Sequence, residues 1–216
     1  MRKISKPHFL FFINWGIRLI ILGALFLAIY FKEWFYAIIA FVGLLLMLVP
    51  FIFKRNYNIF IPIEIEMIYL CFIFLSIILG EIGDYYYKFW WWDLMLHTLS
   101  GILLGLTGFF ILFMLISTKK LRSATSISMF FVFCFAVTLG VFWEIFEFLM
   151  DTIFGLNMQK SGLLDTMSDL IADSFGAMIS SVFGYLYLKF KKNNKISYLI
   201  QKIIDINPRY FKNKKI

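Results

Sequence analysis

Charged residues are scarce in this sequence. They make up 16% of its 216 residues, whereas 62% of the residues are hydrophobic and the mean hydropathy is +0.84. A soluble domain of this length could not bury so much apolar surface, and several apolar runs approach or exceed the ~20 residues that cross a bilayer. The composition therefore excludes an ordinary soluble domain and predicts an all-α polytopic membrane protein.

Cysteine is also rare, and several familiar catalytic motifs are missing. Cys71 and Cys134 both fall inside apolar runs, which predicts free thiols and not a disulfide or a cysteine-based metal site. The chain has no His-Glu-x2-His zinc helix, no Gly-x-Ser-x-Gly elbow and no phosphate-cradling glycine loop. The net charge of +8 does not indicate nucleic-acid binding, because no basic stripe carries interleaved stacking aromatics. We expect no nucleic-acid partner.

Six apolar runs predict six transmembrane helices. The expected spans are 8–31, 34–53, 59–80, 94–116, 127–150 and 166–188. The first run follows a basic start, but its length and the lack of a small-residue cleavage pattern predict a retained span and not a signal peptide. We expect one membrane domain over 1–188 and a basic tail over 189–216, in which 196–206 favours a short interfacial helix.

The basic residues predict the orientation of these spans. With the N-terminus in the cytoplasm, 17 of the 21 lysine and arginine residues fall on the cytoplasmic side, as the positive-inside rule requires. Both termini are therefore expected to be cytoplasmic. This topology places nine acidic residues and one histidine at the outward ends of four helices. They are Glu81, Asp84, Asp93, His97, Glu144, Glu147, Asp151, Asp165, Asp169 and Asp173.

Asp93 and His97 form the first candidate site pair. They are four residues apart, so a helix places them on one face. A carboxylate that binds one imidazole nitrogen leaves the other nitrogen available as a metal ligand or a general base. The alternative reading is a polar cap at the membrane surface, in which Asp93 begins the helix.

Two further acidic stripes complete the candidate site. Glu144, Glu147 and Asp151 are spaced by three and four residues, and Asp165, Asp169 and Asp173 are spaced by four and four. Carboxylates this close repel one another, so some must be protonated, paired or bound to a metal. The set therefore predicts a site for a divalent cation. Its expected ligands are Asp93, His97, Glu144, Glu147, Asp165, Asp169 and Asp173, and the expected catalytic residues among them are His97, Glu144 and Asp169.

Small residues suggest how the stripes meet. Each of the last three spans carries a small-x3-small pattern, which lets membrane helices approach closely. The patterns are Gly101-x3-Gly105, Ala136-x3-Gly140 and Gly176-x3-Ser180-x3-Gly184. We therefore expect these three spans to pack together as a core.

Arg18 is the one cation deep inside an expected span. A structural ion pair with one of the outward acids is the favoured reading. The alternative is that Arg18 binds an anionic group of a substrate, such as a phosphate.

Three ordered motifs resemble a known family. They are Asp93-x3-His97-x3-Gly101, the segment from Trp143-Glu144 to Glu147-Phe148, and Asp165-x3-Asp169-x6-Gly176-Ala177. Together they resemble the YjdF-like family of predicted bacterial inner-membrane proteins and, more distantly, VanZ-like membrane proteins. Leu94 and Thr98 stand where the YjdF-like motif has arginine and phenylalanine. The resemblance implies a multi-pass protein of the bacterial cytoplasmic membrane, and it names no reaction.

Three functions fit these features. The first is a divalent-metal-dependent enzyme that acts on a lipid or lipid-linked cell-envelope molecule from the outer leaflet. The second is a cation- or proton-coupled transporter or channel that uses the acids as a relay. The third is a non-catalytic membrane protein whose polar cluster specifies helix packing. The number of carboxylates favours a functional site over packing alone, and the absence of an evident inverted repeat weakly favours the enzyme over the transporter.

Overall fold

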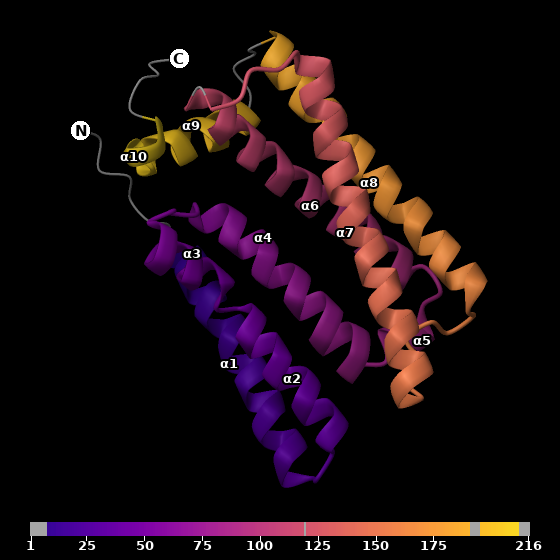
Figure 1. Cartoon of the computed structure of the whole chain (residues 1–216). Coiled ribbons are helices and arrows are strands. Elements are labelled where there is room, and N and C mark those ends of the chain that lie inside the picture. The colour runs from indigo at the N-terminus through magenta and orange to yellow at the C-terminus, as the bar shows by residue number, and fades with distance from the viewer. Residues whose placement is uncertain (1–7, 119, 191–194, 212–216) are drawn as a thin grey trace. The chain divides into compact units, whose positions relative to one another are not determined.

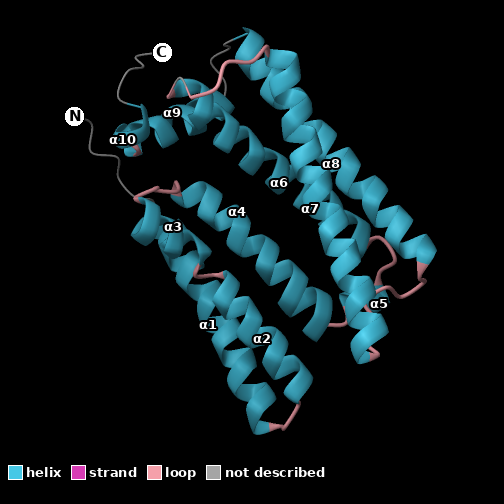
Figure 2. Cartoon of the chain, in the orientation of Figure 1, coloured by secondary structure: helices cyan, strands magenta, loops and turns pink. Residues whose placement is uncertain are grey.

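The computed structural model describes residues 8–118, 120–190 and 195–211. In this part of the chain every regular element is a helix, and the connections are short loops (Figure 2). Six helices are long and apolar enough to cross a membrane, which confirms the predicted all-α class and the six spans. Close contacts group the chain into two compact units, Met1–Phe89 with Asp205–Asn207, and Trp90–Ile204 with Pro208–Ile216.

The first unit contains the first three spans (Figure 1). Its elements are α1 (His8–Tyr30), α2 (Trp34–Leu46), α3 (Val49–Tyr57), α4 (Ile63–Phe74), the π-helix η1 (Leu75–Ile82) and the short α5 (Tyr85–Lys88). The buried core of the unit includes Ile21, Ala40, Met47 and Leu70. Since lipid is as apolar as these side chains, close packing and not water exclusion is what holds such helices together.

Two spans of this unit are less regular than the sequence predicts. The second span runs from Trp34 to Tyr57 but is broken into α2 and α3 at Met47 and Leu48, just before Pro50. Proline has no N–H to donate, and it is well tolerated at the start of a helix. The third span continues from α4 directly into η1. Neither change alters the number of spans.

The second unit contains the last three spans. They are α6 (Trp92–Ser117), α7 (Thr125–Phe154) and α8 (Leu163–Phe190), and each packs against the other two. Figure 1 shows α7 and α8 running side by side over much of their length. This confirms the expectation, drawn from the small residues, that these three helices form a core.

The chain after α8 is helical as well. It forms α9 (Lys195–Ile206) and α10 (Pro208–Phe211), so the predicted helix over 196–206 is present. Ile200 and Ile204 are buried against Phe109 and Phe113 of α6. The apolar side of α9 therefore packs on helices of its own unit. The division into a membrane domain over 1–188 and a tail over 189–216 stays a prediction.

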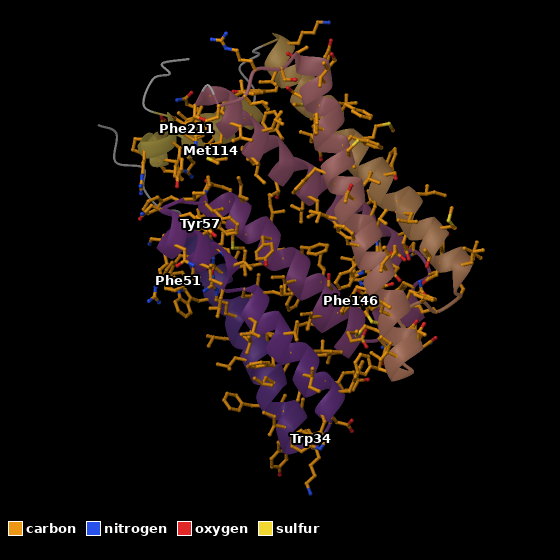
Figure 3. The ribbon with its side chains drawn as sticks, viewed as in Figure 1. Trp34, Phe51, Tyr57, Met114, Phe146 and Phe211 are labelled. Atoms are coloured by element: carbon orange, nitrogen blue, oxygen red, sulfur yellow. The ribbon has the colours of Figure 1, made fainter. Side chains whose placement is uncertain are left out.

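Large apolar side chains cover the outer surfaces of the helices. Figure 3 shows Trp34 at the start of α2 and Phe51 and Tyr57 on α3, and each of these side chains is about half exposed or more. Phe146 on α7 is 43% exposed. Exposed side chains of this size and number suit a lipid environment and not water. The orientation of the two termini across the bilayer stays a prediction.

Candidate metal centre

The polar cluster is built at one end of α6, α7 and α8. Asp93 and His97 lie in the first two turns of α6, and His97 is 8% exposed. Glu144 lies on α7 and Asp169 on α8, and both are more than nine-tenths buried. The structure thus brings together residues that the sequence placed on three separate spans.

The His97 imidazole is surrounded by four carboxylates. Its Nδ1 lies 3.2 Å from Asp173 Oδ2 and 3.9 Å from Glu144 Oε1. Its Nε2 lies 3.8 Å from Asp93 Oδ1 and 3.9 Å from Asp169 Oδ2. Only the Asp173 contact is within hydrogen-bond distance.

Asp173, and not Asp93, is therefore the carboxylate that orients His97. Ser100 supports it from α6, because the Ser100 hydroxyl donates to Asp173 Oδ1 at 2.6 Å. We assign the Nδ1–H tautomer, which donates to Asp173 and leaves the lone pair of Nε2 directed toward Asp93 and Asp169. A carboxylate behind a histidine in this way is the usual arrangement of a metal-binding imidazole.

Two carboxylates of the cluster have buried oxygens without a hydrogen-bond donor among the described residues. Among the described residues, neither oxygen of Glu144 nor Oδ2 of Asp169 has a hydrogen-bond donor. Burying an ionised carboxylate without a partner is very costly, so such groups are protonated, paired with a cation or bound to a metal. Glu144 approaches Nδ1 of His97, whereas Asp169 approaches Nε2, so an occupant bound to Nε2 and Asp169 contacts Glu144 only if that side chain turns toward the Nε2 side of the ring.

The geometry of this group is close to that of a metal site. One ligand atom each from His97, Glu144 and Asp169 can be chosen so that all three lie within 4.8 Å of one another. Ligands about 2.0–2.2 Å from a metal lie roughly 3.5 Å apart, so the side chains need only a small inward movement. One nitrogen and two or more oxygens suit Zn²⁺, Mn²⁺ or Fe²⁺.

A second group shares one member with the first. Asp93, Asp165 and Asp169 also offer ligand atoms within 4.8 Å of one another. Asp93 and Asp165 are only partly buried, whereas Asp169 is buried. Lys160, in the loop between α7 and α8, donates to Asp93 Oδ2 at 2.5 Å.

The remaining acids of the two stripes have other partners. Glu147 is buried on α7 and accepts a hydrogen bond from Trp143 Nε1 at 2.8 Å. Asp151 accepts the backbone N–H groups of Met158 and Gln159, which fixes the loop after α7. Glu147 as a metal ligand stays a prediction, since its neighbours already satisfy one of its oxygens.

Arg18 belongs to the first unit and has a different acidic partner from those expected. Its guanidinium pairs with Glu66 Oε1 at 2.8 Å, and Asn14 donates to the same oxygen at 2.9 Å. The ion pair that the sequence favoured is present, but with an acid near the start of α4 and not with the outward stripes. A substrate-binding role for Arg18 stays a prediction.

Sequence reasoning missed two supporting residues. Ser100 was not among the expected site residues, although its hydroxyl holds Asp173. Lys160 was not among them either, although its ammonium pairs with Asp93. One signal was visible for Lys160, because it is the single cation between the two acidic stripes.

Comparisons with known proteins support the membrane assignment and leave the activity open. The profile of a family described as "Predicted membrane protein (DUF2238)" matches residues 13–190. An uncharacterized protein of Thermotoga maritima is 32% identical over 129 residues, which is 59% of this chain and 65% of that relative. The matched region thus spans slightly less than two thirds of the relative. No solved structure matches the chain. None of these comparisons supports the more distant resemblance to VanZ-like proteins.

Proposed function

The chain belongs to the membrane protein family DUF2238, and we propose that it is a membrane-embedded enzyme that depends on a divalent metal. The observation that carries this proposal is the group of buried carboxylate oxygens beside His97, both of Glu144 and Oδ2 of Asp169, that have no hydrogen-bond donor among the described residues. A proton on each would remove the charge but would leave polar atoms unmatched. A divalent cation satisfies all three groups at once when Glu144 turns toward the Nε2 side of the ring.

Each residue of the centre has a role in this proposal. His97, Glu144 and Asp169 hold the ion, and Asp173 with Ser100 fixes the orientation and tautomer of the imidazole. A divalent ion bound here would polarise a substrate oxygen and lower the pKa of a bound water. Three protein ligands leave room for substrate, as in many catalytic metal sites. Metal binding also requires deprotonated ligands, so it should weaken at acid pH.

We further propose that the substrate is a lipid or a lipid-linked cell-envelope molecule. Asp93 and Asp165 are partly exposed at the end of the helices, whereas Glu144 and Asp169 are enclosed. A polar headgroup could thus approach at the helix ends while its acyl chains remain in lipid. With the proposed topology this side is the outer leaflet, and the YjdF-like resemblance implies that the membrane is the bacterial cytoplasmic membrane.

Transport is the less favoured function. The buried core of the second unit beyond the cluster contains Phe109, Phe113, Met129 and Val132, with no buried ionisable side chain among the described residues. A charge would have to cross this apolar layer without a relay, which is costly. The cluster is therefore better suited to chemistry at one membrane face than to conduction.

The first experiment measures metal content. The chain is purified in detergent, loaded with Zn²⁺ or Mn²⁺, dialysed and analysed by elemental mass spectrometry. We expect at least one tightly held ion per chain and a loss of most of it in Glu144→Gln and Asp169→Asn. Glu33→Gln is the matched control, because Glu33 is exposed in the loop between α1 and α2. Wild-type protein that holds no ion would overturn the proposal.

A second measurement addresses catalysis. The metal-loaded protein is incubated with a total lipid extract of bacterial envelopes, and mass spectrometry follows each lipid species. We expect the loss of one class with the appearance of its cleaved product, and no change with Glu144→Gln. If tightly bound metal is present but every lipid class is unchanged, the enzymatic part of the proposal is wrong and a structural metal is favoured.

A further inference from the structure

We infer that the centre takes two divalent cations, with Asp169 as the ligand that bridges them. This inference rests on the proposed function, because it adds a second position to the metal centre proposed there. The second position is formed by Asp93, Asp165 and Asp169. The first is formed by His97, Glu144 and Asp169.

The sharing of Asp169 is the geometric basis. It is the one residue common to both groups, and in each group three ligand atoms lie within 4.8 Å of one another. A carboxylate has two oxygens and can bridge two cations. In two-metal sites the cations are about 3.5–4 Å apart, which a bridging carboxylate spans. Asp169 is 2% exposed, and its Oδ2 has no donor among the described residues.

The charge of the cluster also favours two cations. Six carboxyl groups lie on the three helices at this level, namely Asp93, Glu144, Glu147, Asp165, Asp169 and Asp173. One of them, Asp93, is paired with the ammonium of Lys160. The acidic groups thus outnumber the lysine that pairs with them, and each divalent cation that binds would offset two negative charges and lower the electrostatic cost of burying the group.

The two positions differ in chemistry. The first includes an imidazole nitrogen and suits a transition metal, whereas the second offers only carboxylate oxygens and suits a hard cation such as Mg²⁺ or Mn²⁺. Mn²⁺ accepts both ligand sets and is the probe of choice. Two cations at one face would together neutralise an anionic group, so the inferred substrate class is a lipid with a phosphoryl headgroup.

Lys160 competes with the second cation. Its ammonium lies 2.5 Å from Asp93 Oδ2, so it occupies a position that a cation on Asp93 would need. The second cation must displace this ammonium and therefore binds more weakly than the first. Asp151 holds the part of the loop that precedes Lys160, because its carboxylate accepts hydrogen bonds from the backbone N–H groups of Met158 and Gln159.

The test is a Mn²⁺ titration of the detergent-purified full chain, followed by electron paramagnetic resonance of free Mn²⁺. We expect two ions per chain, the second weaker, with exchange coupling between them at full occupancy. Asp165→Asn should leave one ion and no coupling. Lys160→Met should lower the dissociation constant of the second ion by about fivefold, because removal of one competing ion pair can change an affinity by this factor. Asp84→Asn is the control, because this carboxylate is exposed on the first unit.

The outcomes separate this inference from the proposed function. One ion per chain in the wild type, unaffected by Asp165→Asn, overturns the second position and leaves the first intact. No bound ion overturns both. The Lys160→Met variant is expected to bind the second ion more tightly, and a misfolded protein could not produce this gain. An unchanged affinity for the second ion in this variant would contradict the competition with Lys160.

Discussion

His97 is held by a carboxylate from another helix. Asp173 lies on α8, 76 residues further along the chain, and it contacts the imidazole at 3.2 Å while Ser100 holds its other oxygen. The three residues thus connect α6 to α8 through a chain of hydrogen bonds. Partners behind a metal ligand tune both its orientation and its basicity. Ser100 is therefore a positioning residue of the proposed centre.

Removal of the Ser100 hydroxyl should weaken metal binding without abolishing it. Ser100→Ala frees Asp173 to turn away from His97, and loss of such a supporting group typically reduces metal affinity about 10- to 100-fold. Zn²⁺ competition with a chromophoric chelator measures this change. Thr107→Val is the control on the same helix, because the exposed Thr107 hydroxyl contacts only the carbonyl of Leu103 among the described residues. Equal affinities in both variants would contradict the positioning role.

At the scale of single residues, spacing predicted which acids share a helix face but not which partners they meet. Asp93 and His97 do lie on one face of α6, as their separation of four residues predicts. The nearer partner of His97 is nevertheless Asp173, since contacts across helices depend on rotation and depth that no local spacing encodes. The pairing of Arg18 with Glu66 could not be predicted from the sequence for the same reason.

At the scale of the helices, close contact between α6 and α8 positions the site. A Cβ atom added at Gly176 would collide with the backbone carbonyl of Thr98, and one added at Gly101 would collide with that of Asp173. Both obstacles are backbone atoms, so they cannot rotate away. Glycine at these two positions is what lets the backbones approach closely enough for Asp173 to meet His97.

Gly176→Ala should therefore separate the two helices. Overpacking of this kind typically costs about 1–3 kcal/mol, and we expect a lower thermal midpoint in detergent together with reduced Mn²⁺ binding. Gly23→Ala is the matched control, because no atom lies within 4 Å of the added Cβ in α1. That variant should be neutral or slightly stabilising, since alanine favours a helix more than glycine. Similar melting of the two variants would refute the role of close packing.

Hydropathy was sufficient to predict the helices but not their irregularities. Six apolar runs gave six spans in the right places, because length and composition decide whether a segment can cross a bilayer. The break at Met47 and Leu48 and the π-helix over Leu75–Ile82 were not predictable, since apolar side chains fit either form. The small-x3-small patterns did predict the packing of α6, α7 and α8, because close approach requires small residues.

At the scale of the whole molecule, the positive-inside rule predicts which face carries the centre. We propose testing it with single cysteines in a background in which Cys71 and Cys134 are replaced by alanine. Glu33→Cys should react with a membrane-impermeant maleimide on intact spheroplasts, and Arg55→Cys should react only after permeabilisation. Both residues are exposed and lie at opposite ends of the second span.

The reverse labelling pattern would move the centre to the cytoplasmic face. The proposed substrate would then have to be reached from the inner leaflet, while the metal ligands themselves would be unaffected. Labelling of both cysteines in intact spheroplasts would instead contradict a membrane-crossing segment between them. A third cysteine at exposed Thr107 should react at neither face, since it lies near the middle of α6.

The burial of acids on three different helices has a consequence for how the protein is made. α8 carries Asp165, Asp169 and Asp173, and it emerges from the ribosome after α6 and α7. Until it arrives, His97 and Glu144 have none of their α8 neighbours, and charged groups in hydrocarbon are strongly disfavoured. We therefore expect α6 and α7 to stay near an aqueous or protein-lined path during insertion until α8 joins them. The arrival of the last span would then decide when the two spans before it move into lipid.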